Sequence, residues 1–283
     1  MAEIIDGKAL SEKLKAEIAE RTEKLALKGH RTGLAVILVG ENPASKIYVK
    51  NKIAACERTG IKSFSYTFPE TAEESEVAEL ICALNEDDNV DGILVQLPLP
   101  RHMDERRLLE MISPDKDADG FHTQNAGRLF LGEECSAACT PSGIIELIKS
   151  TGVSIEGKHA VIIGRSNIVG KPLAMLLLQN NATVTICHSK TKNIKEISKT
   201  ADILAVAIGS AEFVTADFVK PGAVVIDVGM NRTENGLKGD VKFDEVSKTA
   251  GYITPVPGGV GPMTITMLLS NTLKAAEKRY GVK

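Results

Sequence analysis

The chain has 283 residues, of which 43% are hydrophobic and 25% are charged, and its formal net charge is -3. This length accommodates one large domain or two of ordinary size, and the composition is typical of a globular protein. Without a basic stripe or a polybasic cluster, the charge pattern argues against a nucleic-acid partner and against a membrane surface. The longest apolar runs, such as residues 33–39 and 203–208, are strand-length, whereas a bilayer-spanning helix needs about 20 residues.

Cysteine usage indicates a reducing compartment. Five cysteines are scattered along the chain without a CxxC pair, and the first residues carry acids rather than a basic-then-apolar signal pattern. We therefore expect reduced thiols and a cytoplasmic location. No metal site is expected, because Cys135 and Cys139 have no second pair of ligands nearby.

In the first half, apolar segments alternate with segments of helical periodicity. We expect helices over residues 8–27, 43–59, 72–84 and 104–112, and strands over residues 33–39, 63–68 and 92–97. Continuous apolar strands joined by helices predict a parallel sheet that is covered on both faces.

The second half repeats the alternation. Thr140 followed by Pro141 predicts the N-cap and first turn of a helix that ends near residue 149. Strands are expected over residues 159–163, 183–187, 203–208, 223–228 and 251–254, and helices over residues 172–180, 193–199 and 262–279. We predict an α/β fold with two parallel-sheet domains: residues 1–139, against which a last helix at 262–283 packs, and residues 140–261.

A glycine turn follows the strand at 159–163. Gly164, Arg165 and Ser166 precede the helix expected over residues 172–180. A strand, a glycine turn and a helix N-terminus in this order are typical of the phosphate-binding turn of a Rossmann unit. The spacing differs from GxGxxG, since Ser166 stands at the second glycine, so a purely structural turn remains an alternative.

The end of the next strand bears on which dinucleotide binds. His188, Ser189 and Lys190 follow it, and none of them is the acid that usually holds the ribose of NAD. Arg165, Ser189 and Lys190 suit a 2′-phosphate instead, which favours NADP. The alternative is that the two cations are solvated surface charges.

Tyr48 and Lys52 lie four residues apart on a predicted helix and therefore share a face. A partly desolvated lysine has a lowered pKa and can shuttle protons, with the tyrosine beside it as a hydrogen-bond donor. Ordinary exposed side chains are the alternative. Short-chain dehydrogenases carry the same pair downstream of the glycine turn, whereas here it lies upstream, which counts against that class.

Three further segments carry polar or flexible residues. Gln96 ends an apolar strand, where open α/β sheets bind ligands. Asp115, Asp117 and Asp119 fall within five residues; we interpret the first two as turn residues and the third as an acceptor for the donor edge of a heterocycle. A glycine- and proline-rich loop at residues 255–264 allows close approach to a flat ligand.

Six motifs in order resemble the bifunctional methylenetetrahydrofolate dehydrogenase/methenyltetrahydrofolate cyclohydrolase family. They span nearly the whole chain and read YVKNK at 48–52, GILVQLPLP at 92–100, DKDADGFH at 115–122, GRSNIVGKP at 164–172, VVIDVGMNR at 224–232 and PVPGGVGPMT at 255–264. Ala118 and Ala138 depart from the valine and the proline that the family pattern leads us to expect, and both lie away from the chemistry.

The resemblance implies a second domain of Rossmann type, a cleft between the domains and two successive reactions. NADP takes a hydride from the methylene carbon of the folate, and water then opens the methenyl product to 10-formyltetrahydrofolate. Lys52 resembles the essential lysine for proton transfer, with Gln96 holding it, Tyr48 near the pterin ring and Asp119 accepting its amino-pyrimidine edge. The implied folate contacts are Tyr48, Lys52, Gln96, Leu97, Asp119, Pro257, Gly258, Gly259, Val260, Gly261 and Pro262, and the implied cofactor contacts are Gly164, Arg165, Ser166, Ser189 and Met230.

The resemblance also implies a homodimer through the second domain. Alternatives are a dehydrogenase without hydrolytic activity, another two-domain NAD(P)-dependent oxidoreductase such as a hydroxyacid or shikimate-type dehydrogenase, and a non-catalytic nucleotide-binding module. Tyr48, Lys52 and Gln96 together argue against the first. The pterin-side motifs argue against the second, and the presence of Lys52 and Asp119 argues against the third.

Overall fold

The computed structural model describes residues 1–234 and 236–282, which form two compact units. We call the unit of Lys13–Ala137 and the residues from Ile265 onward the three-strand unit. The unit of Met1–Glu12 and Ala138–Thr264 is called the six-strand unit. Neither unit is a single stretch of sequence.

The sheet of the three-strand unit is parallel, with the order β3-β2-β4. Its central strand β2 (Gly33–Val39) is buried along its whole length, because helices cover both faces and leave no polar side. The neighbours are β3 (Lys62–Phe68) and β4 (Gly92–Val95). All three strands end at one edge, where residue 96 follows β4.

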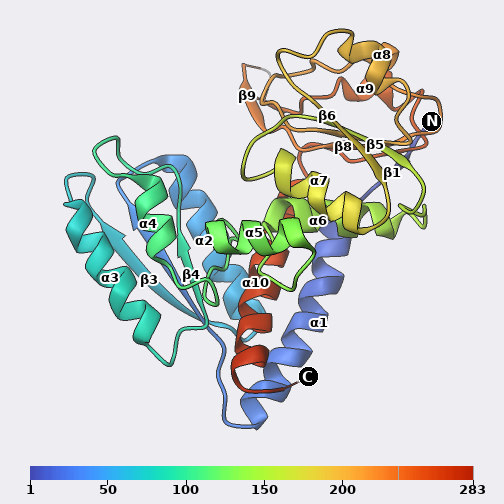
Figure 1. Cartoon of the computed structure of the whole chain (residues 1–283). Coiled ribbons are helices and arrows are strands. Elements are labelled where there is room, and N and C mark those ends of the chain that lie inside the picture. Colours follow the sequence, from blue (N-terminus) through green and yellow to red (C-terminus); the bar gives the residue numbers. More distant parts are fainter. Residues whose placement is uncertain (235, 283) are drawn as a thin grey trace. The chain divides into compact units, whose positions relative to one another are not determined.

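The helices of this unit cover both faces of the sheet. Helix α2 (Pro43–Arg58) connects β2 to β3, and α3 (Glu74–Glu86) connects β3 to β4 in the opposite direction. Right-handed crossovers therefore place them on opposite faces. Figure 1 shows α3 together with α4 (Glu105–Met111) on one side of the sheet. The core beneath them contains Ile37, Ile81, Ile93 and Leu108.

Several short elements were not predicted from the sequence, among them one helix and one pair of strands. Helix α5 (Thr123–Leu131) begins after His122, whose Nδ1 accepts from Gln124 N, and ends at Gly132, which has φ of 76°. Strands β9 (Asn231–Thr233) and β10 (Gly236–Lys238) form an antiparallel pair in the six-strand unit. Both elements are too short to give a clear periodic pattern.

The main sheet of the six-strand unit is parallel throughout, in the order β1-β11-β8-β7-β5-β6. Its strands are β1 (Glu3–Ile4), β5 (His159–Ile163), β6 (Thr183–Cys187), β7 (Ile203–Val206), β8 (Val224–Asp227) and β11 (Tyr252–Ile253). The chain passes from β5 to β6 on one side and returns to β7 on the other. The topological switch point therefore lies at the carboxyl ends of β5 and β7, where such sheets bind ligands.

Helices cover both faces of this sheet as well. Figure 1 shows α6 (Cys139–Ser150) and α7 (Gly170–Gln179) on one side and α8 (Ile194–Ser198) and α9 (Phe243–Val246) on the other. A short 3-10 helix, Ala216–Phe218, precedes β8. The sheet and helices together give the doubly wound arrangement that the sequence predicts for this half.

The predicted N-cap at Thr140 is wrong. Helix α6 begins at Cys139 after Ala138, which makes no side-chain capping bond. Thr140 lies inside the first turn, and its hydroxyl is 3.0 Å from the hydroxyl of Thr264. The Thr-Pro pattern marks the right helix but misses its start, because a tertiary partner takes the threonine side chain.

The N-terminus groups differently from the expected first domain of residues 1–139. Strand β1 pairs in parallel with β11, so Met1–Glu12 belongs to the six-strand unit. Helix α1 (Gly7–Leu27) therefore has residues in both units. A two-residue strand carries too little pattern for sequence reading to assign its partner.

The last helix, α10 (Val260–Arg279), also has residues in both units. Asn271 donates from Nδ2 to the carbonyl oxygens of Ala118 and Ala137, at 3.0 Å each. The expected end of this helix at Lys283 lies outside the described residues. Among residues 1–234 and 236–282, no helix is both long enough and apolar enough to cross a bilayer.

Candidate active site

Helix α2 carries two of the predicted site residues. Asn42 caps the helix by accepting hydrogen bonds from Ala44 N and Ser45 N, and Pro43 occupies its first turn. Tyr48 and Lys52 follow one turn apart. Tyr48 is 37% exposed and accessible to a ligand, whereas Lys52 is only 8% exposed.

Gln96 lies directly against Lys52. The Nζ atom of Lys52 donates to Oε1 of Gln96 at 3.0 Å, and Nε2 of Gln96 donates to the carbonyl oxygen of Leu97 at 2.8 Å. The Gln96 backbone N–H donates to Ile37 O, which ties it to the central strand. The carboxamide is thus held with its oxygen toward the lysine, so two sequence-predicted residues from different elements meet.

Asp119 lies beside the same strand end. Ile93 N donates to Lys116 O at 2.7 Å, and residue 117 pairs in parallel with Ile93. The parallel register carries Asp119 toward the carboxyl end of β4, where Gln96 follows. Desolvation raises the pKa of the Asp119 carboxyl to about 6, the Lys52 charge opposes this and the Asp117 charge adds to it.

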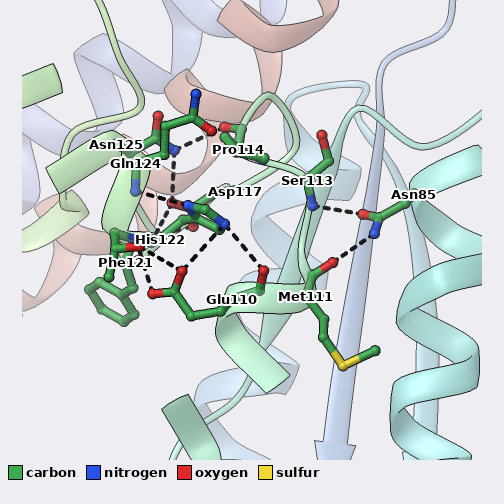
Figure 2. A network of polar contacts seen from close by, with 11 residues as sticks. Asn85, Glu110, Met111, Ser113, Pro114, Asp117, Phe121, His122, Gln124 and Asn125 are labelled. Atoms are coloured by element: carbon green, nitrogen blue, oxygen red, sulfur yellow. Dashed lines mark hydrogen bonds and ion pairs between the residues drawn. The ribbon is translucent and has the colours of Figure 1, made fainter. Parts of the chain in front are cut away.

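The turn that holds Asp119 is organised by Asp117 (Figure 2). Oδ1 of Asp117 accepts from the backbone N–H groups of Gly120 and Phe121, at 3.0 and 3.2 Å. Oδ2 accepts from His122 N at 2.9 Å. The interpretation of Asp117 as a turn residue is confirmed. Asp115 also lies in a turn, which the 2.8 Å hydrogen bond from Lys116 N to Ser113 O closes, and its carboxylate forms an ion pair with Lys278 at 2.7 Å.

Asn125 is a member of this network that sequence reasoning missed. It is 1% exposed, and its Nδ2 donates to Asp117 Oδ2 and Pro114 O, both at 2.9 Å. Figure 2 shows it next to the Asp117 turn at the start of α5. A signal was present, because an asparagine on the apolar face of a short helix has to satisfy its amide inside the protein.

In the six-strand unit, the predicted phosphate-binding turn is tightly closed. Gly164 has φ of 135°, and a Cβ atom there would lie 2.3 Å from Ala207 O. A Cβ atom on Gly170 would lie 2.2 Å from Gly164 O. Glycine is therefore required at both positions, and the turn packs against the segment that follows β7.

Ser166 takes the place of the second glycine in an unexpected way. Its Oγ accepts from Val169 N at 3.1 Å and from Gly170 N at 3.4 Å, at the start of α7. A hydroxyl that accepts two hydrogen bonds still has its own O–H to donate. Arg165 and Ser166 are both exposed, so this donor and the guanidinium face solvent at the switch point.

The remaining predicted cofactor residues lie at strand ends of the same unit. Ser189 and Lys190 are exposed after β6, and residues 188–190 include no carboxylate. Met230 is 46% exposed after β8, and a Cβ atom on Gly261 would lie 3.8 Å from its sulfur. The glycine- and proline-rich loop thus passes close to Met230.

That loop is fixed by close backbone contacts. A Cβ atom on Gly7 would lie 1.9 Å from Gly259 O, and Lys8 N donates to Gly258 O at 2.9 Å. Pro257 and Gly261 stay exposed, whereas Gly259 and Val260 are buried. Within the described ranges, no group of three or more His, Cys, Asp or Glu side chains is placed to hold a metal ion.

The sequence comparisons match both units. Residues 5–119 match the family profile described as "Tetrahydrofolate dehydrogenase/cyclohydrolase, catalytic domain". Residues 138–280 match the one described as "Tetrahydrofolate dehydrogenase/cyclohydrolase, NAD(P)-binding domain". The chain belongs to the tetrahydrofolate dehydrogenase/cyclohydrolase family. The alternatives of an unrelated two-domain oxidoreductase and of a simple nucleotide-binding module are therefore wrong.

Relatives of this family align over almost the whole chain. "Bifunctional protein FolD" of Listeria innocua is 57% identical over 279 residues, which cover 98% of each chain. The crystal structure of the bifunctional enzyme FolD from Campylobacter jejuni has a TM-score of 0.97 at 53% identity and covers 99% of this chain and 100% of that one. The Trypanosoma brucei dehydrogenase-cyclohydrolase, solved with NADP cofactor and inhibitor, has a TM-score of 0.93 at 39% identity and covers 99% and 98%.

Proposed function

We propose that this protein oxidises 5,10-methylenetetrahydrofolate with NADP and hydrolyses the resulting 5,10-methenyltetrahydrofolate to 10-formyltetrahydrofolate. The observation that carries the proposal is the 3.0 Å hydrogen bond from Lys52 to Gln96, next to Asp119, in a member of this family. A buried amine held by a carboxamide is equipped for proton transfer, which the hydrolytic step requires.

NADP is the proposed acceptor of the hydride in the oxidation. The donor set of the six-strand unit fits a dinucleotide phosphate: the Gly164 turn leaves no side chain in the way, and the Ser166 hydroxyl keeps a proton to donate. A helix N-terminus adds a partial positive charge at this point. Gly164, Arg165 and Ser166 would therefore hold the phosphates.

The choice of NADP over NAD is supported by charge. Arg165 and Lys190 are exposed cations near the end of β6. Ser189, which directly precedes Lys190, is also exposed and adds a hydroxyl. A 2′-phosphate is stabilised by such groups, whereas a free ribose is usually held by an acid. Met230, exposed after β8, is proposed to contact the cofactor as well.

On the folate side, Asp119 is proposed to accept hydrogen bonds from the amino-pyrimidine edge of the pterin, with the Tyr48 ring alongside. An ionised carboxylate is an acceptor on both oxygens, which matches two adjacent N–H donors. Leu97, next to Gln96, supplies an apolar contact. The prediction that Pro257, Gly258, Gly259, Val260, Gly261 and Pro262 also contact folate stays a prediction.

Lys52 is proposed to move the protons of the hydrolytic step. Water adds to the methenyl carbon, the Lys52 amine takes one of its protons, and the tetrahedral carbon carries a hydroxyl. The bond from this carbon to N5 of the folate then breaks as N5 receives that proton back from Lys52. The hydroxyl collapses to the formyl group and releases one proton, so the cationic substrate and water give a neutral product. Gln96 keeps Nζ in place throughout.

A cytoplasmic homodimer completes the proposal. None of the described cysteines forms a disulfide, which suits a reducing compartment. At one edge of the main sheet, β6 exposes Ile186 (36%), and Leu178 of α7 is 56% exposed. An open sheet edge with apolar side chains is a surface that proteins cover, and a second copy of this unit would do so.

The test is an assay of the purified protein with 5,10-methylenetetrahydrofolate and NADP, followed by absorbance of the reduced cofactor and of the methenyl product. Parallel reactions contain NAD or preformed methenyltetrahydrofolate. We expect NADP reduction together with accelerated loss of the methenyl substrate. Reduction without hydrolysis would leave a dehydrogenase alone, and reduction with NAD only would overturn the assignment of Arg165 and Ser189.

A further inference from the structure

Two buried acids of the six-strand unit take no part in the proposed chemistry. Asp227 ends β8 and is 3% exposed, and Asp240, shortly after β10, is fully buried. Burying a carboxylate is costly unless hydrogen bonds compensate it, and two neighbouring carboxylates add repulsion. The hydrogen-bond donors to the two carboxylates therefore indicate the role of these acids.

Asp240 collects four donors from two separate segments. Its Oδ2 accepts from Ile208 N at 2.7 Å and Gly209 N at 3.0 Å. Its Oδ1 accepts from Ser210 N at 2.8 Å and from Asn231 Nδ2 at 2.9 Å. One carboxylate thus ties the loop that follows β7 to the loop that follows β8.

Both loops reach the proposed cofactor site. The first begins at Ala207. Its carbonyl oxygen lies so near Gly164 that a Cβ atom there would be 2.3 Å away. The second contains Met230, between Gly229 and Asn231. These loops leave the carboxyl ends of strands at or next to the topological switch point, where ligands of this fold bind.

Asp227 orients its neighbour. Its Oδ1 accepts from Gly229 N and from Asp240 N, both at 2.9 Å, and its Oδ2 accepts from Val241 N at 3.0 Å. It therefore holds the backbone of Asp240 as well as the start of the loop that carries Met230. Neither acid has a described cation among these partners, so backbone N–H groups and the Asn231 amide stabilise the two carboxylates.

Two glycines make the arrangement possible. A Cβ atom on Gly229 would lie 2.4 Å from Asp240 Cγ, and one on Gly239 would lie 1.8 Å from Asp227 Oδ2. Any side chain at either position would displace a carboxylate. The two acids can therefore lie close together only because both positions are glycine.

We infer that Asp227 and Asp240 are positioning residues that lock the loops after β7 and β8 into the conformation that binds NADP. The inference rests on the proposed NADP binding by this unit. Neither acid is placed in contact with the cofactor, and each acts through the backbone that it holds. A carboxamide at position 240 would turn an N–H₂ group toward at least one backbone donor, so that the loops lose one tether and gain a repulsive contact.

The test compares Asp240→Asn and Asp227→Asn with a matched control, Asp202→Asn. Asp202 is also an acid that accepts a backbone N–H, from His159 at 3.0 Å, but at the amino ends of the strands. The NADP dissociation constant is measured by titration calorimetry, and hydrolysis of preformed methenyltetrahydrofolate is measured without NADP. We expect NADP binding to weaken about tenfold, or by about 1.4 kcal/mol, in the two variants. The control keeps wild-type NADP affinity, and all three keep the NADP-free hydrolysis rate.

A milder variant covers the case in which loss of an acid prevents folding. Asn231→Ala removes one donor from Asp240 at a half-buried position and is expected to weaken NADP binding while the thermal midpoint changes little. Wild-type affinity in the folded variants, or equal losses of NADP binding and NADP-free hydrolysis, would overturn the inference. A wild-type protein that fails to bind NADP would instead reject the proposed function, and the inference with it.

Discussion

Asp119 is the proposed site residue whose protonation state changes closest to neutral pH. Its carboxyl has a pKa of about 6, because burial disfavours the charged form more than the Lys52 charge favours it. The carboxylate therefore takes up its proton at a higher pH than an ordinary aspartate. Above this pKa it accepts hydrogen bonds on both oxygens, and below it one oxygen becomes a donor.

We expect the KM for methylenetetrahydrofolate to rise as the pH falls through about 6, since the protonated Asp119 presents a donor to the donor edge of the pterin. Asp119→Asn should have a high KM at every pH, with the rise absent. Steady-state kinetics of both proteins across this pH range measure the effect, with Asp115→Asn, an exposed acid in an ion pair, as the control. If the KM of Asp119→Asn also rises as the pH falls, a group other than Asp119 causes the pH dependence.

Single residues were predicted from the sequence with uneven success. Lys52, Gln96 and Asp119 were proposed as site residues because they fall in recognisable motifs, and the structure places Lys52 against Gln96. Asp227 and Asp240 were not found. Their partners are mostly backbone N–H groups, which every residue except proline carries, so no residue type in the sequence marks the partnership.

At the scale of elements, the segment between α4 and α5 is held by Asp117 rather than by regular secondary structure. Asp117→Asn keeps one acceptor oxygen but turns an N–H₂ group toward backbone donors. We expect unfolding free energy to fall by about 1–3 kcal/mol, the cost of leaving such a buried group unsatisfied. Urea denaturation measures it.

The same substitution should raise the KM for folate, because Asp119 is two residues away in the same turn. NADP affinity should stay unchanged, since Gly164 and its neighbours belong to the other unit. Asn125→Ala, which removes one donor to Asp117, is expected to act in the same direction but more weakly. Unchanged folate kinetics in a destabilised Asp117→Asn protein would mean that the turn contributes to stability without positioning Asp119.

Long buried elements were predicted well and short ones poorly. The apolar run at residues 33–39 coincides with β2, because a parallel strand covered on both faces has no polar side. Helix α5, with nine residues, and the β9–β10 pair have patterns too short to stand out. Strand β1 has two residues, and only its pairing with β11 defines it.

At the scale of the whole molecule, the fold class was predictable and the exact grouping of segments was not. Alternating strands and helices indicate two parallel α/β sheets, as observed. The first twelve residues belong to the six-strand unit because β1 pairs with β11, about 250 positions further along the chain. Local sequence patterns do not indicate which distant strand a segment pairs with.

The proposed homodimer predicts a sedimenting species of twice the chain mass of 30.3 kDa. Ile186→Lys, on the exposed edge strand β6, should shift the protein toward the monomer because a charge would have to be buried at the interface. Sedimentation velocity over a range of concentrations measures both. A wild-type protein that sediments as a single chain would remove the dimer from the proposal.

The central claim is that one folate site, with Lys52 as its proton-transfer group, serves the hydrolytic reaction. The most direct measurement is hydrolysis of preformed methenyltetrahydrofolate by Lys52→Gln, with Lys50→Gln, an exposed lysine of the same helix, as the matched control. We predict that Lys52→Gln loses hydrolysis by about 100-fold or more, as expected for loss of an acid–base group, while Lys50→Gln keeps it. Full hydrolytic activity in a folded Lys52→Gln protein would contradict the claim.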